Sequence, residues 1–215
     1  MSVRRQPWEV YNQRARFYDS IMSASGYHPT VREMIRTIPL DVGGESRVLD
    51  IGCGTGLATD VFLERYPDSE IVGMDCSESM LRIYNNKFPG LSTLCGDFNN
   101  GNCFRSYPGG GMVKLEPSSF DIIVSTGAVS EYGDLERTIP FIHSLLREDG
   151  VFINVGVRKN VINKISGRIW HYKPNGREKL VQSCRDTGFR DIEDMNISIR
   201  HFPSNMLKYV VKAVK

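Results

Sequence analysis

Several features that would mark a membrane, secreted or disulfide-stapled protein are missing from this sequence of 215 residues. No apolar run approaches the roughly 20 residues that a membrane-spanning helix needs. Early arginines stand near the start, but no apolar segment follows them, so we expect no secretory signal. The five cysteines are odd in number, scattered and free of any C-x-x-C pair, which argues against a disulfide framework and a structural zinc site. We therefore expect a cytoplasmic protein with reduced thiols, no transmembrane segment and no bound metal.

A strong charge of one sign is also lacking, because the formal net charge is only +2. The distribution is nevertheless uneven. Residues 1–150 hold 14 Lys and Arg against 20 Asp and Glu, whereas residues 151–215 hold 13 against 5. Two explanations stay open: the charges balance over the surface of one folded unit, or the basic C-terminal third faces an anionic partner or substrate.

What the chain does contain is an alternation of short β-branched runs with segments of helical spacing. Strands are expected at 47–51, 70–74, 91–94, 121–125 and 151–157, and helices at 57–66, 77–87 and 135–147. Ser77 stands where the N-cap of the second of these helices would lie. The alternation implies right-handed crossovers and a mostly parallel sheet covered by helices on both faces. Residues 189–199 and 205–214 read as two strands paired antiparallel at one edge. We therefore predict an α/β, Rossmann-like, doubly wound sheet of seven strands with an antiparallel C-terminal edge pair.

Two segments fall outside this alternation. Residues 7–37 read as helices that precede the first strand. Residues 99–119 are rich in Gly, Asn, Ser and Pro and are too long for a routine connection. We expect them to form a mobile loop between the third and fourth strands.

The most informative stretch is "VLDIGCGTG", residues 48–56, which runs from a strand into a helix. Gly52, Gly54 and Gly56 allow a tight turn and a close approach of the backbone to a ligand, and the following helix offers free N–H groups. The dinucleotide fingerprint G-x-G-x-x-G places its third glycine one position later. It also gives no reason for Asp50, because a carboxylate repels a pyrophosphate. A ligand that carries an ammonium group and a sulfonium but no phosphate would suit this acid.

This stretch resembles motif I of the class I S-adenosylmethionine-dependent methyltransferases, and residues 45–157 follow the layout of that family. Asp75 ends the second strand, where an acidic side chain accepts hydrogen bonds from both ribose hydroxyls. "GMDCSESML" resembles the second motif, "CGDF" the segment after the third strand, and "FDIIVSTGAV" the fourth motif. The resemblance implies S-adenosylmethionine as cofactor, S-adenosylhomocysteine as product, and a binding set of Asp50, Gly52, Cys53, Gly54, Gly56, Asp75, Cys76, Met80, Asp97, Phe98 and Thr126.

The N-terminal "YNQRARFYD" resembles a segment that folds over the cofactor in many small-molecule members of the family. On this basis residues 1–40 are expected to form a helical cap, and residues 41–215 the methyltransferase domain. Tyr11 and Tyr18 would place rings against the sulfonium, and Arg14 would reach the methionine carboxylate. The alternative is an amphipathic helix that packs its aromatic residues onto the domain.

Catalytic residues are harder to identify, because methyl transfer requires alignment of the reactants and exclusion of water rather than a fixed motif. A general base is needed only if the acceptor must lose a proton. Glu131 and Tyr132 follow the fourth strand, and His171 lies within "RIWHYKP". Each is a candidate base, but the first two could lie in a solvated loop and His171 could be packed between aromatic residues.

Residues 157–180 follow the fifth strand, where members of the family build part of the acceptor pocket. This segment is basic and interleaved with aromatic residues, which fits a small anionic molecule, an anionic lipid headgroup or RNA. A small or lipid-like acceptor is favoured over RNA, because the chain leaves no space for a recognition domain. DNA is not expected, because no "NPPY"-type motif follows the fourth strand. Two other classes stay open: a non-catalytic module that binds the cofactor or a partner, and a nucleotide-dependent oxidoreductase. The acceptor and the oligomeric state are not encoded in any motif.

Overall fold

The computed structural model of the protein describes residues 7–195 and 204–215. The strands are β1 (Arg47–Ile51), β2 (Glu70–Asp75), β3 (Ser92–Cys95), β4 (Phe104–Tyr107), β5 (Met112–Val113), β6 (Phe120–Thr126), β7 (Leu146–Val157), β8 (Arg190–Met195) and β9 (Lys208–Val214). The helices are α1 (Pro7–Ala24), α2 (Tyr27–Thr37), α3 (Leu57–Arg65), α4 (Glu78–Lys87), α5 (Val129–Tyr132), α6 (Leu135–Leu145), α7 (Val161–Trp170), α8 (Arg177–Thr187) and α9 (Ser204–Leu207), with a 3-10 turn η1 (Phe98–Asn100).

The described strands form one mixed sheet in the order β5-β4-β3-β2-β1-β6-β7-β9-β8. Its centre is parallel, since β1 pairs with β2 on one side and with β6 on the other, so that Asp50 lies opposite both Gly73 and Val124. The chain order reverses between β1 and β6. In open α/β sheets, such a switch point is where ligands bind, beyond the carboxyl ends of the strands.

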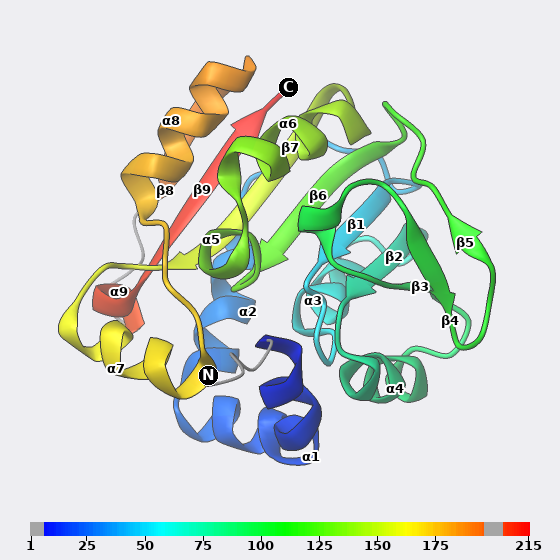
Figure 1. The fold of residues 1–215 in the computed structure, drawn as a ribbon. Coiled ribbons are helices and arrows are strands. Elements are labelled where there is room, and N and C mark those ends of the chain that lie inside the picture. The colour runs from blue at the N-terminus through cyan, green and yellow to red at the C-terminus, as the bar shows by residue number, and fades with distance from the viewer. Residues whose placement is uncertain (1–6, 196–203) are drawn as a thin grey trace.

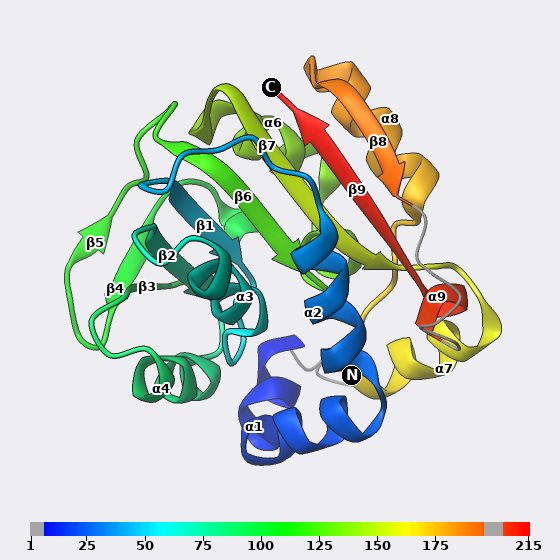
Figure 2. The same cartoon turned by 180° about the vertical axis from the view of Figure 1, so that it is seen from behind.

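Helices cover both faces of the sheet (Figures 1 and 2), and a hydrophobic layer lies under the helices on each face. Because side chains alternate along a strand, Val48 and Leu49 belong to opposite layers. The layer that contains Leu49 packs against α6 and α8, including the fully buried Leu180. The layer that contains Val48 packs against α2 and α3, including the fully buried Phe62. The sheet is thereby held rigidly, with its carboxyl edge free to carry a site.

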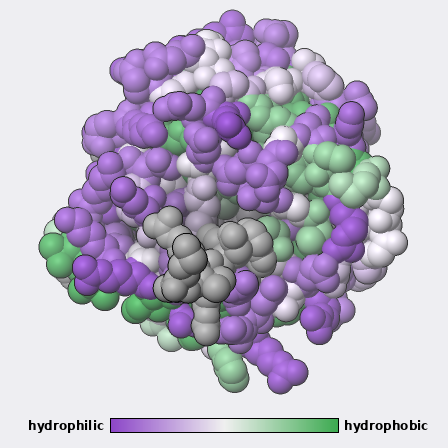
Figure 3. All heavy atoms as spheres, in the orientation of Figure 1, coloured by the Kyte–Doolittle hydropathy of each residue, from purple (hydrophilic) through white to green (hydrophobic). Residues whose placement is uncertain are grey.

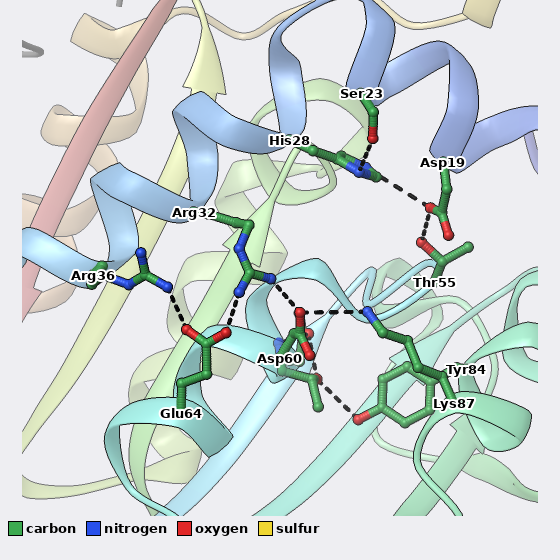
Figure 4. Close-up of polar contacts among 12 residues, drawn as sticks. Asp19, Ser23, His28, Arg32, Arg36, Thr55, Asp60, Glu64, Tyr84 and Lys87 are labelled. Atoms are coloured by element: carbon green, nitrogen blue, oxygen red, sulfur yellow. Dashed lines mark hydrogen bonds and ion pairs between the residues drawn. The ribbon is translucent and has the colours of Figure 1, made fainter.

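Ion pairs join the N-terminal helix α2 to this framework (Figure 4). Arg32 of α2 pairs with Asp60 and Glu64 of α3, and Arg36 pairs with Glu64 as well. Lys87 at the end of α4 lies 3.6 Å from the Asp60 carboxylate. Because these side chains are partly exposed, each pair contributes on the order of 0.2–1 kcal/mol, and their role is mainly to fix the orientation of α2.

The predicted fold class is confirmed: the sheet has a parallel core, an antiparallel edge of β8 and β9, and helices on both faces. The predicted number of seven strands is wrong, because the described residues contain nine. Both additional strands, β4 and β5, lie within residues 99–119, for which a mobile loop was predicted. Phe104 is fully buried there, and β4 pairs antiparallel with β3 from Thr93↔Tyr107 to Cys95↔Arg105. One buried aromatic residue among turn formers is too weak a signal for a short edge hairpin.

The C-terminal edge pair was also predicted with different bounds. The second strand begins at Lys208 rather than at residue 205, because Ser204–Leu207 forms the short helix α9. Residues 196–199 of the first predicted strand lie outside the described residues. In the part of the chain that the structure describes, every helix is too short or too polar to cross a membrane.

Candidate active site

The carboxyl ends of β1, β2, β3 and β6 enclose a cavity of about 230 Å³, referred to below as the first cavity. Its walls come from the glycine turn, the segments after β2, β3 and β6, and helix α1 above. The structure brings most of the predicted site residues together in this lining: Tyr11, Tyr18, Gly52, Gly54, Asp75, Cys76, Met80, Asp97, Phe98, Thr126 and Tyr132. Gly96, Asn99, Gly127 and Ala128 complete it.

The three glycines of the turn have positive φ angles of 70°, 54° and 89°, but they serve different purposes. A Cβ atom on Gly52 would lie 2.2 Å from the Ala128 Cβ, and one on Gly56 would lie 2.2 Å from Phe88. These two glycines are therefore required for packing. A Cβ on Gly54 would meet nothing within 4 Å, although Gly54 lines the cavity. The space beside Gly54 is a cradle that the protein itself does not fill.

Asp75 connects this cradle to the next strand. Its Oδ2 accepts a hydrogen bond of 2.9 Å from the Gly54 N–H, and its Oδ1 accepts one of 2.8 Å from the Ser77 N–H. Burial raises the pKa of the Asp75 carboxyl, although these backbone donors act in the opposite direction. Each carboxylate oxygen has two lone pairs, so Asp75 holds the turn and keeps acceptor capacity for a ligand in the cavity.

Asp50 lies beneath the turn and does not line the first cavity. Its Oδ2 accepts hydrogen bonds from the Thr59 N–H at 3.2 Å and the Thr59 hydroxyl at 2.9 Å, which fix the start of α3. Its Oδ1 is buried and has no hydrogen-bond partner among the described residues. Burial raises the pKa of Asp50 to about 7. Cys53 is similarly buried, beside Gly73. Direct contact of Asp50 and Cys53 with a ligand stays a prediction.

Met80 and Asp97 both line the first cavity. Met80 is almost fully buried, and its N–H donates 3.2 Å to the Ser77 side chain, which is the N-cap that the sequence predicted. Asp97 caps η1 by accepting hydrogen bonds from the Asn99 N–H at 2.9 Å and the Asn99 side-chain amide at 2.8 Å. Asn99 was missed by the sequence analysis. Its Oδ1 accepts from the Asp134 N–H at 2.8 Å and so ties this wall to α6, a long-range contact without a local signal.

Helix α1 lies over the first cavity and is bound directly to its rim. The Thr55 hydroxyl of the glycine turn donates 2.5 Å to Asp19 (Figure 4), and the Ser77 hydroxyl donates 2.7 Å to the Asn12 amide oxygen. Tyr11 and Tyr18 line the cavity, and their contact with a sulfonium stays a prediction. Arg14 points away from it, with its guanidinium 5.0 Å from the centre of the Trp170 ring. The Arg14 Nη1 also donates to the Ile169 carbonyl. A role of Arg14 toward a ligand carboxylate has no support in this geometry.

A second cavity of about 310 Å³ adjoins the first. The two cavities share Tyr11, Tyr18, Thr126 and Gly127, so these four residues form their common boundary. Beyond the boundary the second cavity extends between α1, α7 and the start of β9.

The candidate catalytic residues occupy different positions around the two cavities. Tyr132 lines the first, and its hydroxyl lies 3.0 Å from the Tyr11 hydroxyl and donates 2.8 Å to the Trp170 carbonyl. Glu131 is buried and lines the second. His171 is exposed at the C-cap of α7, with φ 56°, and lines neither cavity. Of the three candidates, Glu131 alone combines burial with a carboxyl group, and burial raises the pKa of that carboxyl.

Glu131 and Lys208 face the second cavity together. The Ser130 hydroxyl donates 2.5 Å to the Glu131 Oε2, and Oε1 has no partner among the described residues. Burial raises the pKa of Glu131, and the positive charge of Lys208 opposes this effect. Burial lowers the pKa of Lys208 to about 8, while its Nζ lies 4.4 Å from the centre of the Tyr27 ring. The sequence analysis missed Lys208, because it lies on β9, far from every motif.

Comparison with known proteins identifies the type of fold. A family model described as "Methyltransferase domain" matches residues 49–152. A malonyl-[acyl-carrier protein] O-methyltransferase of Acetivibrio thermocellus is 26% identical over 147 residues, which cover 66% of this chain and 45% of that protein. The chain thus spans about half the length of this curated relative, and less of several others.

Two solved structures share the architecture over 99% of this chain. A methyltransferase in complex with the Haloferax volcanii Trm112 methyltransferase activator superposes with a TM-score of 0.72 at 19% identity, and 99% of that chain is covered. Phosphoethanolamine N-methyltransferase 2 of Haemonchus contortus, in complex with phosphomonomethylethanolamine and S-adenosylhomocysteine, gives a TM-score of 0.74 at 16% identity over 61% of its length. At these identities the likeness establishes the fold.

Proposed function

The chain belongs to the class I S-adenosylmethionine-dependent methyltransferases, and from this premise we propose that it methylates a small-molecule acceptor. The observation that carries the proposal is the cradle beside Gly54. It is an open space at the carboxyl edge of the sheet, next to an acid at the end of β2, and it leads into a second cavity.

The residues of the first cavity fit S-adenosylmethionine. Asp75 would accept hydrogen bonds from the ribose hydroxyls, and the turn at Gly52 and Gly54 would bring the backbone close to the ligand. Met80, with Asp97 and Phe98, would surround the adenine, as the family motifs imply. When bound, this cofactor supplies an electrophilic methyl group on a sulfonium. Among the described residues that line the first cavity there is no lysine or arginine, which agrees with a ligand that has no phosphate.

Of the predicted cap of residues 1–40, the described part, residues 7–40, serves in this proposal to exclude water from the reacting groups. Tyr11 and Tyr18 close the upper side of both cavities. Helix α2 of this segment packs into the core, whereas α1 is joined to the rim of the first cavity by hydrogen bonds such as the one from Thr55 to Asp19. We infer that α1 moves away from the turn when cofactor and product exchange.

The acceptor would occupy the second cavity and reach the methyl group across the boundary at Thr126 and Gly127. A volume of about 310 Å³ suits a small molecule or the end of a longer one, since small-molecule sites span about 300–1,000 Å³. The curated relatives that match include proteins named for a malonyl group on an acyl-carrier protein and for trans-aconitate as acceptors. We propose the same broad class for this chain.

A lipid-like acceptor is a second candidate, favoured by the surface of α7. Val161, Ile162, Ile165 and Ile169 are exposed there, and Ile162 also lines the second cavity. Residues 151–177 contain no acid, and Figure 3 shows hydrophobic and hydrophilic surface side by side at the lower left, over α7. This combination suits an amphiphile at an anionic lipid surface better than RNA. Co-sedimentation of the protein with vesicles that contain anionic lipid, and loss of this binding in Ile165→Asp, would test the lipid-like acceptor.

All five cysteines are free, which agrees with the proposed cytoplasmic location.

Turnover is tested by mass spectrometry of S-adenosylhomocysteine formed from S-adenosylmethionine in panels of neutral, anionic and cationic small acceptors. Asp75→Ala serves as the variant in which cofactor binding is expected to fail. Product formation by the wild type in one panel, and its loss in Asp75→Ala, supports the proposal. Binding of S-adenosylhomocysteine without turnover in any panel would support a non-catalytic binding module instead.

A further inference from the structure

The second cavity contains one acidic and one basic side chain. Among the described residues that line it, Glu131 and Lys208 are the charged ones, and neither lines the first cavity. The Glu131 Oε1 lies 3.9 Å from the position that a Cβ on Gly127 would take, so this oxygen stands beside the boundary of the two cavities. Buried carboxylate oxygens normally have a partner. An oxygen without one, at the place where an acceptor must arrive, indicates a hydrogen-bond donor on the acceptor.

Aromatic rings surround the same place. Tyr11 stacks on Trp170 with 5.3 Å between ring centres, and Tyr18 meets the Trp170 ring edge-on at 5.9 Å. All three rings line the second cavity. Tyr and Trp rings attract cations through their faces, and the contact of Lys208 with Tyr27 is one instance of this attraction within the same cavity. The boundary is therefore built for a positively charged or hydrogen-bond-donating group.

We propose that the acceptor presents a primary or secondary amine at this boundary, where Glu131 accepts its proton and the rings of Tyr11, Tyr18 and Trp170 hold its alkyl substituents. This inference rests on the function proposed above. A carboxylate as the methylated group is disfavoured, because it would stand beside the Glu131 carboxylate with little water to screen the repulsion. If the acceptor carries an anionic group elsewhere, Lys208 is the side chain that would bind it.

Methyl transfer to the amine requires the loss of one proton before the new bond forms. The ammonium of the acceptor gives one proton to the Glu131 Oε1 and becomes a neutral amine. The nitrogen lone pair then forms the new nitrogen–carbon bond as the sulfur–carbon bond breaks, and the electron pair of that bond stays on sulfur. The methylated nitrogen carries the positive charge, and Glu131 returns its proton to water when the product leaves.

A matched set of acceptors separates the alternatives: 2-phenylethylamine, 2-phenylethanol and 3-phenylpropionate, with n-octylamine, n-octanol and n-octanoate as the alkyl series. Methyl transfer is followed by product mass, and binding to the protein saturated with S-adenosylhomocysteine is followed by calorimetry. We expect amines to bind and to be methylated. Glu131→Gln should lower kcat/KM for amines by about 100-fold or more, as expected for a lost general base. The affinity for S-adenosylhomocysteine should be retained in Glu131→Gln, and the exposed Glu178→Gln should behave as wild type.

The proposal of an amine acceptor is overturned if an alcohol or carboxylate is methylated in preference to the amine with the same phenyl or octyl group. It is also overturned if no amine binds at millimolar concentration to protein that binds S-adenosylhomocysteine, or if Glu131→Gln retains full turnover of amines. A protein that does not bind S-adenosylhomocysteine would instead refute the function on which this inference rests. The calorimetric comparison needs no variant, so it stands even if Glu131→Gln fails to fold.

Discussion

Replacing Gly54 by alanine should weaken binding of the ligand as well as lower the stability of the fold. The φ angle of Gly54 is 54°, and a left-handed conformation costs an L-residue roughly 1–2 kcal/mol. No neighbouring atom lies within 4 Å of the added Cβ, so no clash adds to this strain. For a chain of this size we expect Tm to fall by about 2–8 °C. The methyl group would nevertheless occupy the space where the ligand should contact the backbone, and the affinity for S-adenosylhomocysteine should fall by about tenfold or more, or ~1.4 kcal/mol.

Gly90→Ala is the matched control. Gly90 has a φ angle of 99°, an added Cβ there also meets nothing within 4 Å, and the residue lies outside the first cavity. Thermal unfolding and calorimetric titration of both variants should show comparable losses of stability, but a loss of affinity in Gly54→Ala alone. If Gly54→Ala binds S-adenosylhomocysteine as tightly as the wild type, the cradle beside Gly54 is not the binding site and the reasoning fails.

Three further changes test the neighbouring residues. Asp75→Ala removes the acceptor of the Gly54 and Ser77 N–H groups, so we expect a lower Tm in thermal unfolding and weakened cofactor binding by calorimetry; unchanged affinity would reject the ribose assignment. Because the folded-state pKa of Asp50, about 7, lies above its unfolded value near 3.9, the stability contributed by this group is lost as the pH rises from about 4 to about 7. The difference in unfolding free energy between wild type and Asp50→Asn should therefore decrease over that range and level off above it, and a constant difference in denaturant titrations would contradict the assignment. Asp19→Ala frees α1 from the glycine turn and should speed the release of S-adenosylhomocysteine in stopped-flow measurements with little change in Tm; an unchanged release rate would argue against a moving cap.

Local patterns in the sequence were sufficient for the parallel core and for the glycine turn. The first strand was predicted at the bounds that β1 has, and Ser77 was predicted as the N-cap whose side chain accepts from the Met80 N–H. Both depend on neighbouring residues, in which alternation of apolar positions and capping chemistry are encoded directly. The positions of Gly54 and Asp75 followed from the same short motifs.

Features that depend on distant contacts were not predicted from the sequence. The hairpin of β4 and β5 is stabilised by pairing with β3 and by burial of Phe104, neither of which leaves a repeating pattern in residues 99–119. Arg14 was expected to reach a ligand carboxylate, whereas its guanidinium lies over the Trp170 ring on α7. Lys208 reaches the second cavity because β9 pairs antiparallel with β7, so that Lys208 lies opposite Val157. Tertiary pairing decides each of these positions.

The most direct test of the account is calorimetric titration of the wild-type protein with S-adenosylhomocysteine, with NADH titrated in parallel. The glycine turn, Asp75 and a cavity whose described lining residues include no lysine or arginine predict micromolar binding of S-adenosylhomocysteine and no binding of NADH. Absence of binding by S-adenosylhomocysteine, or binding of NADH alone, would contradict the central claim.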